Sequence, residues 1–300
     1  MVWIPDGRFV MGSNRHYPEE APEHEVFVSG FWIDRYPVTN AAFARFVSAT
    51  AYVTCAERPL DPGLYAGARP ELLVPGSAVF RPPARLVDLG DCLAWWTYVP
   101  GAFWKCPEGP GSSLAGRERD PVVHVAYEDA EAYARWAGKE LPTEAEWERA
   151  ARGGLRGAEF CWGDEPRPGG REFANYWQGR FPFENSVLDG FEGRSPVGSF
   201  PPNGFGLYDM AGNVWEWTQD YYVSRRRPAA APGGVVHDPK GAPREQSYDP
   251  LVPAFPRKVL KGGSFLCAKD QCFRYRPAAR LPQTVDTSAC HIGFRCVVRE

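Results

Sequence analysis

The chain is poor in the features that mark several common classes of protein. It has only five histidines and three methionines, and its lysines and arginines form no stripe apart from Arg225-Arg-Arg227, at a net charge of −3. No apolar run is long enough to span a membrane, and Met1-Val-Trp-Ile-Pro-Asp-Gly7 has neither the charged nor the apolar region of a signal peptide. We therefore expect no nucleic-acid partner, no membrane attachment, a cytoplasmic location and a monomer.

Glycine and proline, in contrast, are abundant. There are 31 glycines and 30 prolines, so together they make up 61 of the 300 residues, and the chain also has 11 tryptophans. This composition argues against a helical bundle or a parallel α/β sheet, and favours irregular backbone held by large aromatic side chains. We predict a single α+β domain over residues 1–300.

Few segments have a clear periodicity. Alternating apolar residues between turn signals predict strands over 2–5, 8–12, 25–28 and 31–33. Capping residues followed by apolar residues at helical spacing predict three helices: after Thr39, from Asp129 to Gly138, and from the Thr143–Glu146 capping box to Gly153.

Two long segments lack such signals. Residues 55–120 are rich in proline and glycine, which suits either the walls of a binding groove or a structural loop over the core. Residues 222–258 hold seven prolines, and we predict that this range is a mobile insertion.

One pair of cysteines stands out among the eight. Cys267 and Cys272 are separated by four residues and follow the turn Lys261-Gly-Gly-Ser264. The spacing alone leaves three possibilities open, which are inert packing, a disulfide, and a soft-metal or redox pair. Zinc is disfavoured because no second Cys/His pair lies nearby, whereas two thiolates suit Cu(I). In the cytoplasm we expect the cysteines to be free thiols.

Oxygen-bearing residues recur on turns between residues 175 and 217. Asparagine, aspartate and glutamate side chains beside glycines are what Ca²⁺ binds, but the same residues are also the ordinary residues of turns. The residues alone leave both interpretations open.

Six motifs together identify a known family. The chain resembles the formylglycine-generating enzyme (sulfatase-modifying factor) family of bacterial type over nearly its whole length. The resemblance implies a variant of the C-type lectin fold with much irregular structure. The motifs, in chain order, are Ile4-Pro-x-Gly-x-Phe-x-Met-Gly12, Pro37-Val-Thr-Asn40, Trp136-Ala-Gly-Lys-x-Leu-Pro-Thr-Glu-Ala-Glu-Trp147, Gly206-Leu-Tyr-Asp-Met-x-Gly-Asn-Val-Trp-Glu-Trp217, Lys261-Gly-Gly-Ser264 and Gly293-Phe-Arg295.

The resemblance implies an activity and a site. Members that oxidise a peptidyl cysteine to Cα-formylglycine carry the Cys-x4-Cys pair that Cys267 and Cys272 match. It implies that the two thiolates hold Cu(I), that the client cysteine adds a third sulfur, and that O2 is the co-substrate. Ser264 and Trp215 match residues lining this cavity, and Ser112 matches a residue of the substrate groove. The implied client is an unfolded sulfatase carrying Cys-x-Pro-x-Arg.

The scaffold also hosts proteins of other functions. The alternative is a non-catalytic, lectin-like binding module in which the cysteines only pack. The chain also departs from the family at Ala268, Gln271 and His291, where many members have histidine, tyrosine and asparagine. These departures concern the positioning of the client thiol and of O2.

The resemblance implies two structural calcium sites as well. Their residues match the family's positions one by one, with backbone carbonyls from Tyr176 and Phe191, and with Asp209 where some members have asparagine. The first set is Asn175, Tyr176, Asp189 and Phe191, and the second is Asp209, Gly212, Val214 and Glu216.

Overall fold

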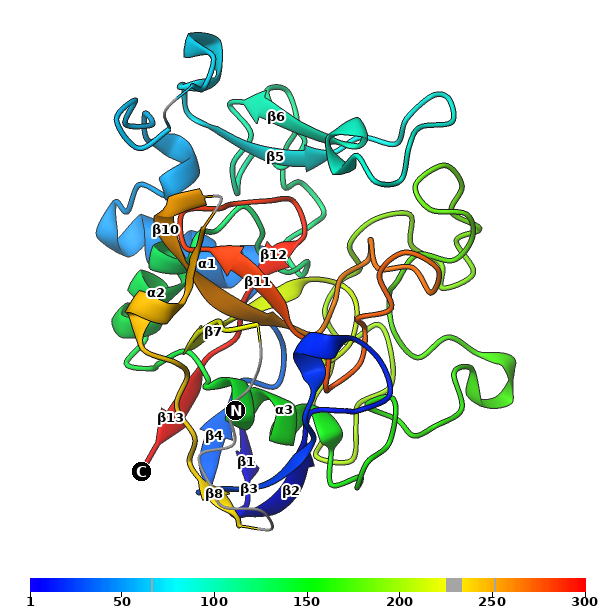
Figure 1. Cartoon of the computed structure of the whole chain (residues 1–300). Coiled ribbons are helices and arrows are strands. Elements are labelled where there is room, and N and C mark those ends of the chain that lie inside the picture. Colours follow the sequence, from blue (N-terminus) through cyan, green and yellow to red (C-terminus); the bar gives the residue numbers. More distant parts are fainter. Residues whose placement is uncertain (66, 225–233, 251) are drawn as a thin grey trace.

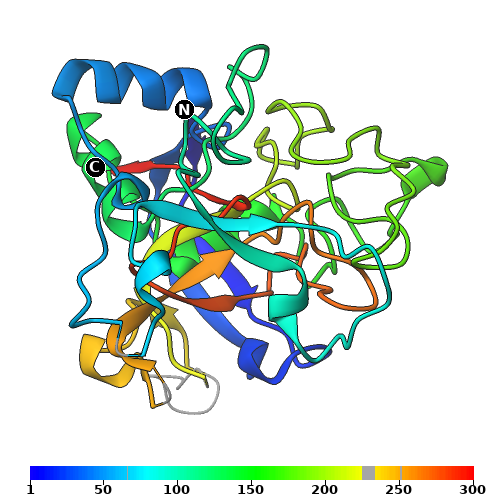
Figure 2. The ribbon, with the colours of Figure 1, turned by 90° about the horizontal axis from the view of Figure 1, so that it is seen from above.

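The structure is a computed structural model, and it describes residues 1–65, 67–224, 234–250 and 252–300 (Figure 1). Short strands and three α-helices are joined by long irregular connections. The irregular residues 155–214 lie together on one side of the molecule in both ribbon views (Figures 1 and 2). No helix in these described ranges has the length and apolar character needed to cross a membrane.

The two ends of the chain meet in one small sheet. β4 lies in the middle of this sheet and pairs antiparallel with both β1 and β13, so that Ile33 faces Val2 on one side and Val297 on the other. A second sheet pairs β2 with β3 and β3 with β8. The strands are β1 (Val2–Ile4), β2 (Gly7–Met11), β3 (His24–Val28), β4 (Phe31–Ile33), β8 (Val236–His237) and β13 (Val297–Arg299). The four strands predicted near the N-terminus are confirmed.

The largest sheet lies at the centre of the fold and carries the loops of interest. Its order is β11-β10-β7-β12, with β9 paired to β10 off this path. β10 ends at Lys261, directly before the Gly-Gly-Ser turn, and β7 begins at Trp215. Its strands are β7 (Trp215–Tyr221), β9 (Tyr248–Asp249), β10 (Val252–Lys261), β11 (Leu281–Thr284) and β12 (Ile292–Gly293).

The helix at residues 144–152 packs against β7 and β10, and two of the helices begin at the capping residues that the sequence predicts. The Thr39 hydroxyl accepts a hydrogen bond from the Ala42 backbone N–H at the start of α1 (Asn40–Thr50). The capping box of Thr143 and Glu146 opens α3 (Glu144–Arg152), as predicted.

The second helix begins earlier than expected. α2 (Tyr127–Trp136) starts two residues before Asp129, because the Asp129 carboxylate accepts a hydrogen bond from the Ala126 backbone N–H. Asp129 is therefore a capping residue within the first turn, and the prediction that it is the first helical residue is wrong. Alanine at the N-cap position gave the sequence no recognisable start signal.

The two segments without periodicity contain strands. Residues 55–120 include the antiparallel hairpin of β5 (Gly76–Phe80) and β6 (Trp96–Pro100), at the top of Figure 1. Within residues 222–258, the described part forms β8, β9 and most of β10. Residues 225–233 and 251 lie outside the described residues, and the mobility of the range stays a prediction.

Two hydrophobic clusters hold these elements together. The main cluster contains the α1 and α3 side chains, Trp215, Trp217 and Cys267. A smaller aromatic cluster joins the β5–β6 hairpin to the loop after β10, and it consists of Trp95, Trp177, Phe181, Phe265, Leu266, Ala268 and Cys290. The loop that carries Cys267 therefore lies between the two clusters.

Candidate active site

The structure brings the two predicted cysteines together. The Sγ atoms of Cys267 and Cys272 lie 3.1 Å apart and are not bonded to each other. Cys267 is buried, whereas Cys272 is half-buried. The seven cysteines whose side chains are described are all free thiols, as predicted, and the Cys92 side chain lies outside that description.

Backbone hydrogen bonds shape the loop around the pair. The Cys267 N–H donates to the Ser264 carbonyl, and the Cys272 N–H donates to the Ala268 carbonyl at 2.8 Å. The Ser264 hydroxyl oxygen accepts from the Leu266 N–H at 3.2 Å, so this side chain forms the turn itself. Gly263 is required there, because it has a φ of 73° and a Cβ would lie 2.8 Å from the Tyr275 nitrogen.

The two thiols differ in acidity. Burial raises the pKa of Cys267, and the neighbouring Cys272 sulfur raises it further. The hydrogen bond from Cys267 lowers the pKa of Cys272 to about 7, and the nearby Arg274 guanidinium acts in the same direction. Near neutral pH the pair therefore loses its first proton in part of the molecules, and the resulting thiolate is on Cys272, hydrogen-bonded by the Cys267 thiol.

Sequence reasoning missed the cation beside this thiolate. Arg274 Nη1 lies 3.9 Å from the Cys272 sulfur, and its Nη2 donates to Glu19 at 2.7 Å. The guanidinium also lies over the Tyr17 ring, 3.7 Å from its centroid. The N-terminal segment thus holds Arg274 in place. The sequence did contain an indication of this role, because Arg274 comes two residues after Cys272.

The other predicted site residues lie around the same loop. Trp215 is buried in the main cluster with Cys267, and its backbone N–H donates to the His291 carbonyl. The His291 ring stacks on Trp96, its Nδ1 is buried without a partner, and burial lowers its pKa to about 3. Ala268 is buried beside Trp177, whereas Gln271 is half-buried.

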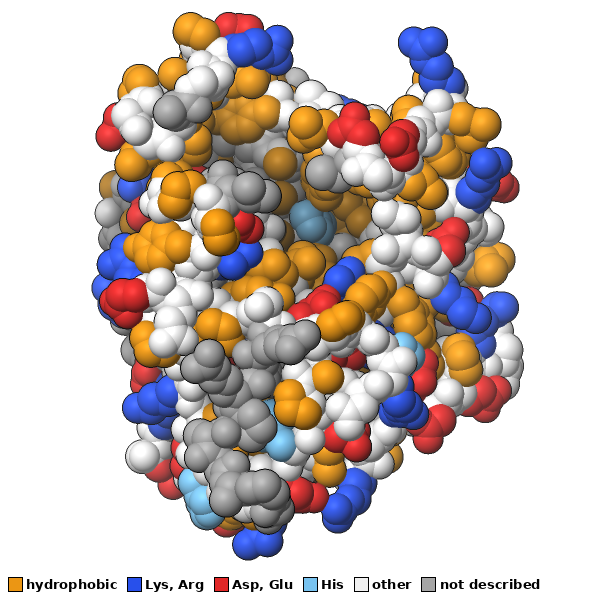
Figure 3. Space-filling view, in the orientation of Figure 1, with side chains coloured by type: hydrophobic (Ala, Val, Ile, Leu, Met, Phe, Trp, Pro, Cys, Tyr) orange, Lys and Arg blue, Asp and Glu red, His pale blue; other side chains and the backbone are white. Residues whose placement is uncertain are grey.

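The surface is hollowed beside these elements. Figure 3 shows a depression below the β5–β6 hairpin, with hydrophobic side chains along its floor. Ser112 belongs to the turn that follows this hairpin in the chain. Its hydroxyl donates to the Gly109 carbonyl at 2.6 Å and accepts from the Glu108 N–H at 3.1 Å. Ser112 therefore fixes the position of Glu108.

The first predicted calcium set has the character of an ion site. The Asn175 Oδ1 atom is buried without a hydrogen-bond partner. The Gln178 side-chain amide donates both to the Tyr176 carbonyl and to the Asp189 carboxylate, so these two oxygens lie close together. The Phe191 N–H donates to the same carboxylate at 2.9 Å. Hard oxygen donors, one of them unsatisfied, fit Ca²⁺.

In the second predicted set, the Glu216 carboxylate already has a cationic partner within the protein. Both Glu216 carboxylate oxygens accept hydrogen bonds from the Arg295 guanidinium, at 2.7 and 2.8 Å, and Trp147 Nε1 donates to one of them at 2.7 Å. Arg295 also donates to the Asp209 carbonyl. A guanidinium already supplies the positive charge at these oxygens, so the Glu216 carboxylate as placed does not fit a calcium ligand.

The buried Asp209 carboxylate makes the stability of the protein depend on pH. Burial, and to a smaller extent the Glu216 carboxylate, raises the pKa of Asp209 to about 6, although the Gly198 N–H and Arg295 act in the opposite direction. Since the folded-state pKa lies above the ordinary 3.8, the contribution of Asp209 to stability is full below about pH 4 and is lost as the pH rises through 6. In Asp209→Asn, the side-chain amide oxygen can still accept the hydrogen bond from the Gly198 N–H. Asparagine also tolerates the left-handed backbone conformation of this residue, which has a φ of 55°.

We therefore expect Asp209→Asn, in chelator, to stabilise the protein at pH 7.5 by roughly 2 to 3 kcal/mol, with the gain vanishing near pH 4. Urea denaturation at both pH values measures it. Asp88→Asn is the control, because exposed Asp88 also accepts one backbone hydrogen bond, from Gly90. A loss of stability at pH 7.5 would contradict this account of Asp209.

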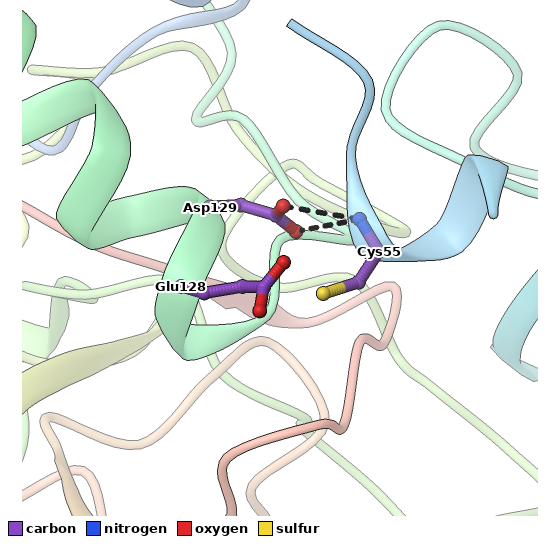
Figure 4. A group of neighbouring side chains, drawn as sticks. All are labelled: Cys55, Glu128 and Asp129. Carbon is purple, nitrogen blue, oxygen red and sulfur yellow. Dashed lines mark hydrogen bonds between the residues drawn. The ribbon is translucent and has the colours of Figure 1, made fainter. Parts of the chain in front are cut away.

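A cluster of possible metal ligands lies elsewhere on the molecule. Figure 4 shows Cys55, Glu128 and Asp129, with the Cys55 N–H donating to the Asp129 carboxylate. Arg58 donates to the Cys55 sulfur at 2.9 Å and pairs with Glu128. The guanidinium pairs with Glu128 and lies 3.8 Å from the Asp129 carboxylate, so it joins the turn at Cys55 to α2, and we interpret the group as a structural link.

Comparison with known proteins places this site in a family. The sulfatase-modifying factor enzyme 1-like domain matches residues 1–300. The chain is 56% identical to the formylglycine-generating enzyme of Mycobacterium tuberculosis, over 99% of this chain and 97% of that protein. It is 44% identical to the mouse formylglycine-generating enzyme, over 99% of this chain and 74% of that protein. The inactive Cα-formylglycine-generating enzyme 2 of mouse is 38% identical, over 99% of this chain and 84% of that protein.

Solved structures bear out the fold. PvdO from Pseudomonas aeruginosa has a TM-score of 0.62 at 24% identity and covers 98% of this chain and 92% of its own. CarF has a TM-score of 0.57 at 19% identity, with 100% and 97% covered. The predicted single domain of mixed helices and short strands is confirmed. The chain belongs to the formylglycine-generating enzyme (sulfatase-modifying factor) family.

Proposed function

We propose that this protein converts a cysteine of a sulfatase polypeptide to Cα-formylglycine, and that it does so as a copper-dependent oxidase. The observation that carries the proposal is the unbonded pair of Cys267 and Cys272, 3.1 Å apart in a buried loop. The formylglycine-generating relatives at 44 to 56% identity support the reaction. A relative at 38% identity is named as inactive, so membership of the family does not by itself give the activity.

The donor set at the pair fits Cu(I). Two sulfur atoms without a third protein ligand within the described residues suit a soft ion of low coordination number. Bound copper would supply affinity for the client thiolate and the redox chemistry by which O2 oxidises the client cysteine. Cys267 and Cys272 are the residues that would hold it.

The protein's own groups prepare this site. Arg274, held by Glu19, stabilises the Cys272 thiolate that a soft ion requires. The Ser264 turn fixes the loop, and the buried Trp215, which belongs to the same cluster as Cys267, would help to keep water away from the pair. His291 stays neutral above about pH 4, since burial lowers its pKa to about 3, and it offers a hydrogen-bonding nitrogen without a charge.

The proposed client is an unfolded sulfatase segment carrying Cys-x-Pro-x-Arg. An extended segment would lie in the hollow below the β5–β6 hairpin (Figure 3), where aromatic side chains can contact it. The proposed setting is the cytoplasm, with the protein acting as a monomer.

One experiment tests the function. The purified protein is loaded with Cu(I) and incubated in air with a Cys-x-Pro-x-Arg peptide, and the peptide mass is then measured. The expected product has the aldehyde in place of the thiol, and the same peptide with serine at that position should give no product. If copper-loaded protein binds the peptide but never forms aldehyde, the protein is a lectin-like binding module of the same fold.

We also propose that Asn175, Tyr176, Asp189 and Phe191 hold a structural calcium ion. A ligand bound only by the folded state stabilises it by roughly 3 to 4 kcal/mol at a hundred- to a thousandfold excess over Kd. We expect EDTA to lower the melting temperature, and Asp189→Ala to lower it in calcium to the same value. A melting curve that is unchanged by EDTA would contradict this site.

A further inference from the structure

A cavity lies between the end of α3 and the β2–β3 hairpin, on which α3 packs (Figure 1). It measures about 540 Å³, which is within the size range of small-molecule sites. None of residues 261–280 lines it, so the cavity is separate from the cysteine loop. A ligand held here would not contact the cysteine pair.

The charged side chains that line this cavity are mostly basic. They are the guanidinium groups of Arg8, Arg149, Arg152 and Arg156 and the carboxylate of Glu25. Arg8 comes from β2 and Glu25 from β3, whereas the three other arginines come from α3 and the turn after it. Segments far apart in the chain thus bring four positive charges to one cavity.

Carboxylates of the protein balance two of these charges. Arg152 Nη2 lies 2.8 Å from the buried Glu148 carboxylate, and Arg156 Nη2 lies 2.8 Å from Glu25. Arg8 and Arg149, in contrast, form no ion pair with any residue that the structure describes. Within the described residues, two positive charges therefore remain without a counter-ion.

Arg149 is held in place with two of its N–H groups unused. The residue is only 8% exposed, and three of its five guanidinium N–H groups donate, to the Pro5 carbonyl twice and to the Arg8 carbonyl once. Burial lowers the pKa of Arg149, although the Asp6 carboxylate acts in the opposite direction. A bound anion would accept the two remaining N–H groups and offset the cost of burying the charge.

The position of α3 accounts for only part of this charge. Arg149 and Arg152 belong to its last turn, where basic side chains stabilise the carbonyl end of a helix. That end contributes a partial negative charge of roughly half a unit, which does not balance Arg8 and Arg149 together. Arg8 and Arg156 lie outside the helix, so its dipole does not explain them.

Apolar side chains line the rest of the cavity. Leu155 is 39% exposed, and Phe205 is half-buried. The full apolar lining is Phe9, Leu155, Phe205 and Val235. An apolar surface beside two unbalanced positive charges fits a ligand that has an apolar body and an anionic group.

We propose that this cavity binds a small organic phosphate, with the phosphate group on Arg8 and Arg149 and the apolar body against Leu155 and Phe205. A phosphate monoester carries about −1.5 to −2 charges at neutral pH, which suits two unbalanced guanidinium groups. The guanidinium fork also matches the spacing of phosphate oxygens. This site is additional to the proposed oxidation of a client cysteine and does not depend on it.

Isothermal titration of the full chain tests the site, with phenyl phosphate and inorganic phosphate as probes at a fixed ionic strength. We expect phenyl phosphate to bind at one saturable site. It should bind more tightly than inorganic phosphate, because its ring buries apolar surface. Phenol, which lacks the phosphate charge, should bind far more weakly than phenyl phosphate.

Two variants separate the two halves of the site. Arg8→Gln removes one unbalanced charge and should weaken both phosphates roughly tenfold. Leu155→Ser removes an apolar contact and should weaken phenyl phosphate alone, roughly three- to tenfold. Arg45→Gln is the matched control and should leave both affinities unchanged. Arg45 is exposed on α1, forms no ion pair with any described residue, and does not line the cavity.

Three outcomes would overturn the proposal. They are the absence of saturable phenyl phosphate binding, equal losses with Arg8→Gln and Arg45→Gln, and equal affinity for phenyl phosphate and inorganic phosphate. Arg8→Gln should also leave the melting temperature unchanged, because no ion pair with a described residue is lost. A clear fall in the melting temperature together with the loss of binding would show a structural role for Arg8 instead of contact with the ligand.

Discussion

Replacing either cysteine of the pair, as Cys267→Ser or Cys272→Ser, is expected to abolish both tight Cu(I) binding and formation of the aldehyde. The two sulfurs lie 3.1 Å apart, and each variant leaves one soft donor where the ion needs two. The hydroxyl of serine remains protonated at neutral pH and does not replace a thiolate. Competition for Cu(I) against a chromophoric chelator measures binding without turnover.

The matched control for these variants is Cys161→Ser. Cys161 is buried, as Cys267 is, and its thiol donates to the Met210 carbonyl, a bond that a serine hydroxyl can also make. Burial raises the pKa of Cys161 to about 12, so no thiolate forms there near neutral pH. Copper affinity and turnover should stay close to those of the unaltered protein. If Cys267→Ser or Cys272→Ser binds Cu(I) as the unaltered protein does, the two-thiolate site is wrong.

The cysteine pair shows how far sequence reasoning reached. The local features were readable: the glycines of the Gly-Gly-Ser turn, the capping residues of α1 and α3 and the four N-terminal strands all depend on residues near one another in the chain. Motif resemblance then selected one of the three interpretations of Cys267 and Cys272. In the structure the two sulfur atoms lie next to each other and form no disulfide.

The features that sequence reasoning missed depend on contacts between distant segments. Arg274 is held by Glu19, 255 residues away along the chain. The β5–β6 hairpin escaped detection for a different reason. Its strands are separated by a long loop, 81–95, so no tight-turn signal marks the pair.

Glu216 shows where a motif and the structure differ. The family match suggested a calcium ligand, because a glutamate near turn residues suits that ion. The structure instead gives both of its oxygens to Arg295, which also donates to the carbonyls of Asp34, Arg35, Tyr208 and Asp209. One guanidinium thus ties the segment after β4, the 206–214 turn and β7 to the C-terminal segment.

Glu216→Gln should therefore destabilise the protein by roughly 3 to 5 kcal/mol, because it leaves the Arg295 charge buried and unpaired. Both side chains are fully buried, so water cannot replace the lost carboxylate. The measurement is urea denaturation in calcium and again in EDTA, with Glu140→Gln as control, since Glu140 pairs with Arg299 at the surface. If the Glu216–Arg295 ion pair stabilises the fold, Glu216→Gln should lower the stability equally in calcium and in EDTA. A loss that appears only in calcium would instead show that Glu216 is the calcium ligand that the motif suggested, with Arg295 a secondary partner.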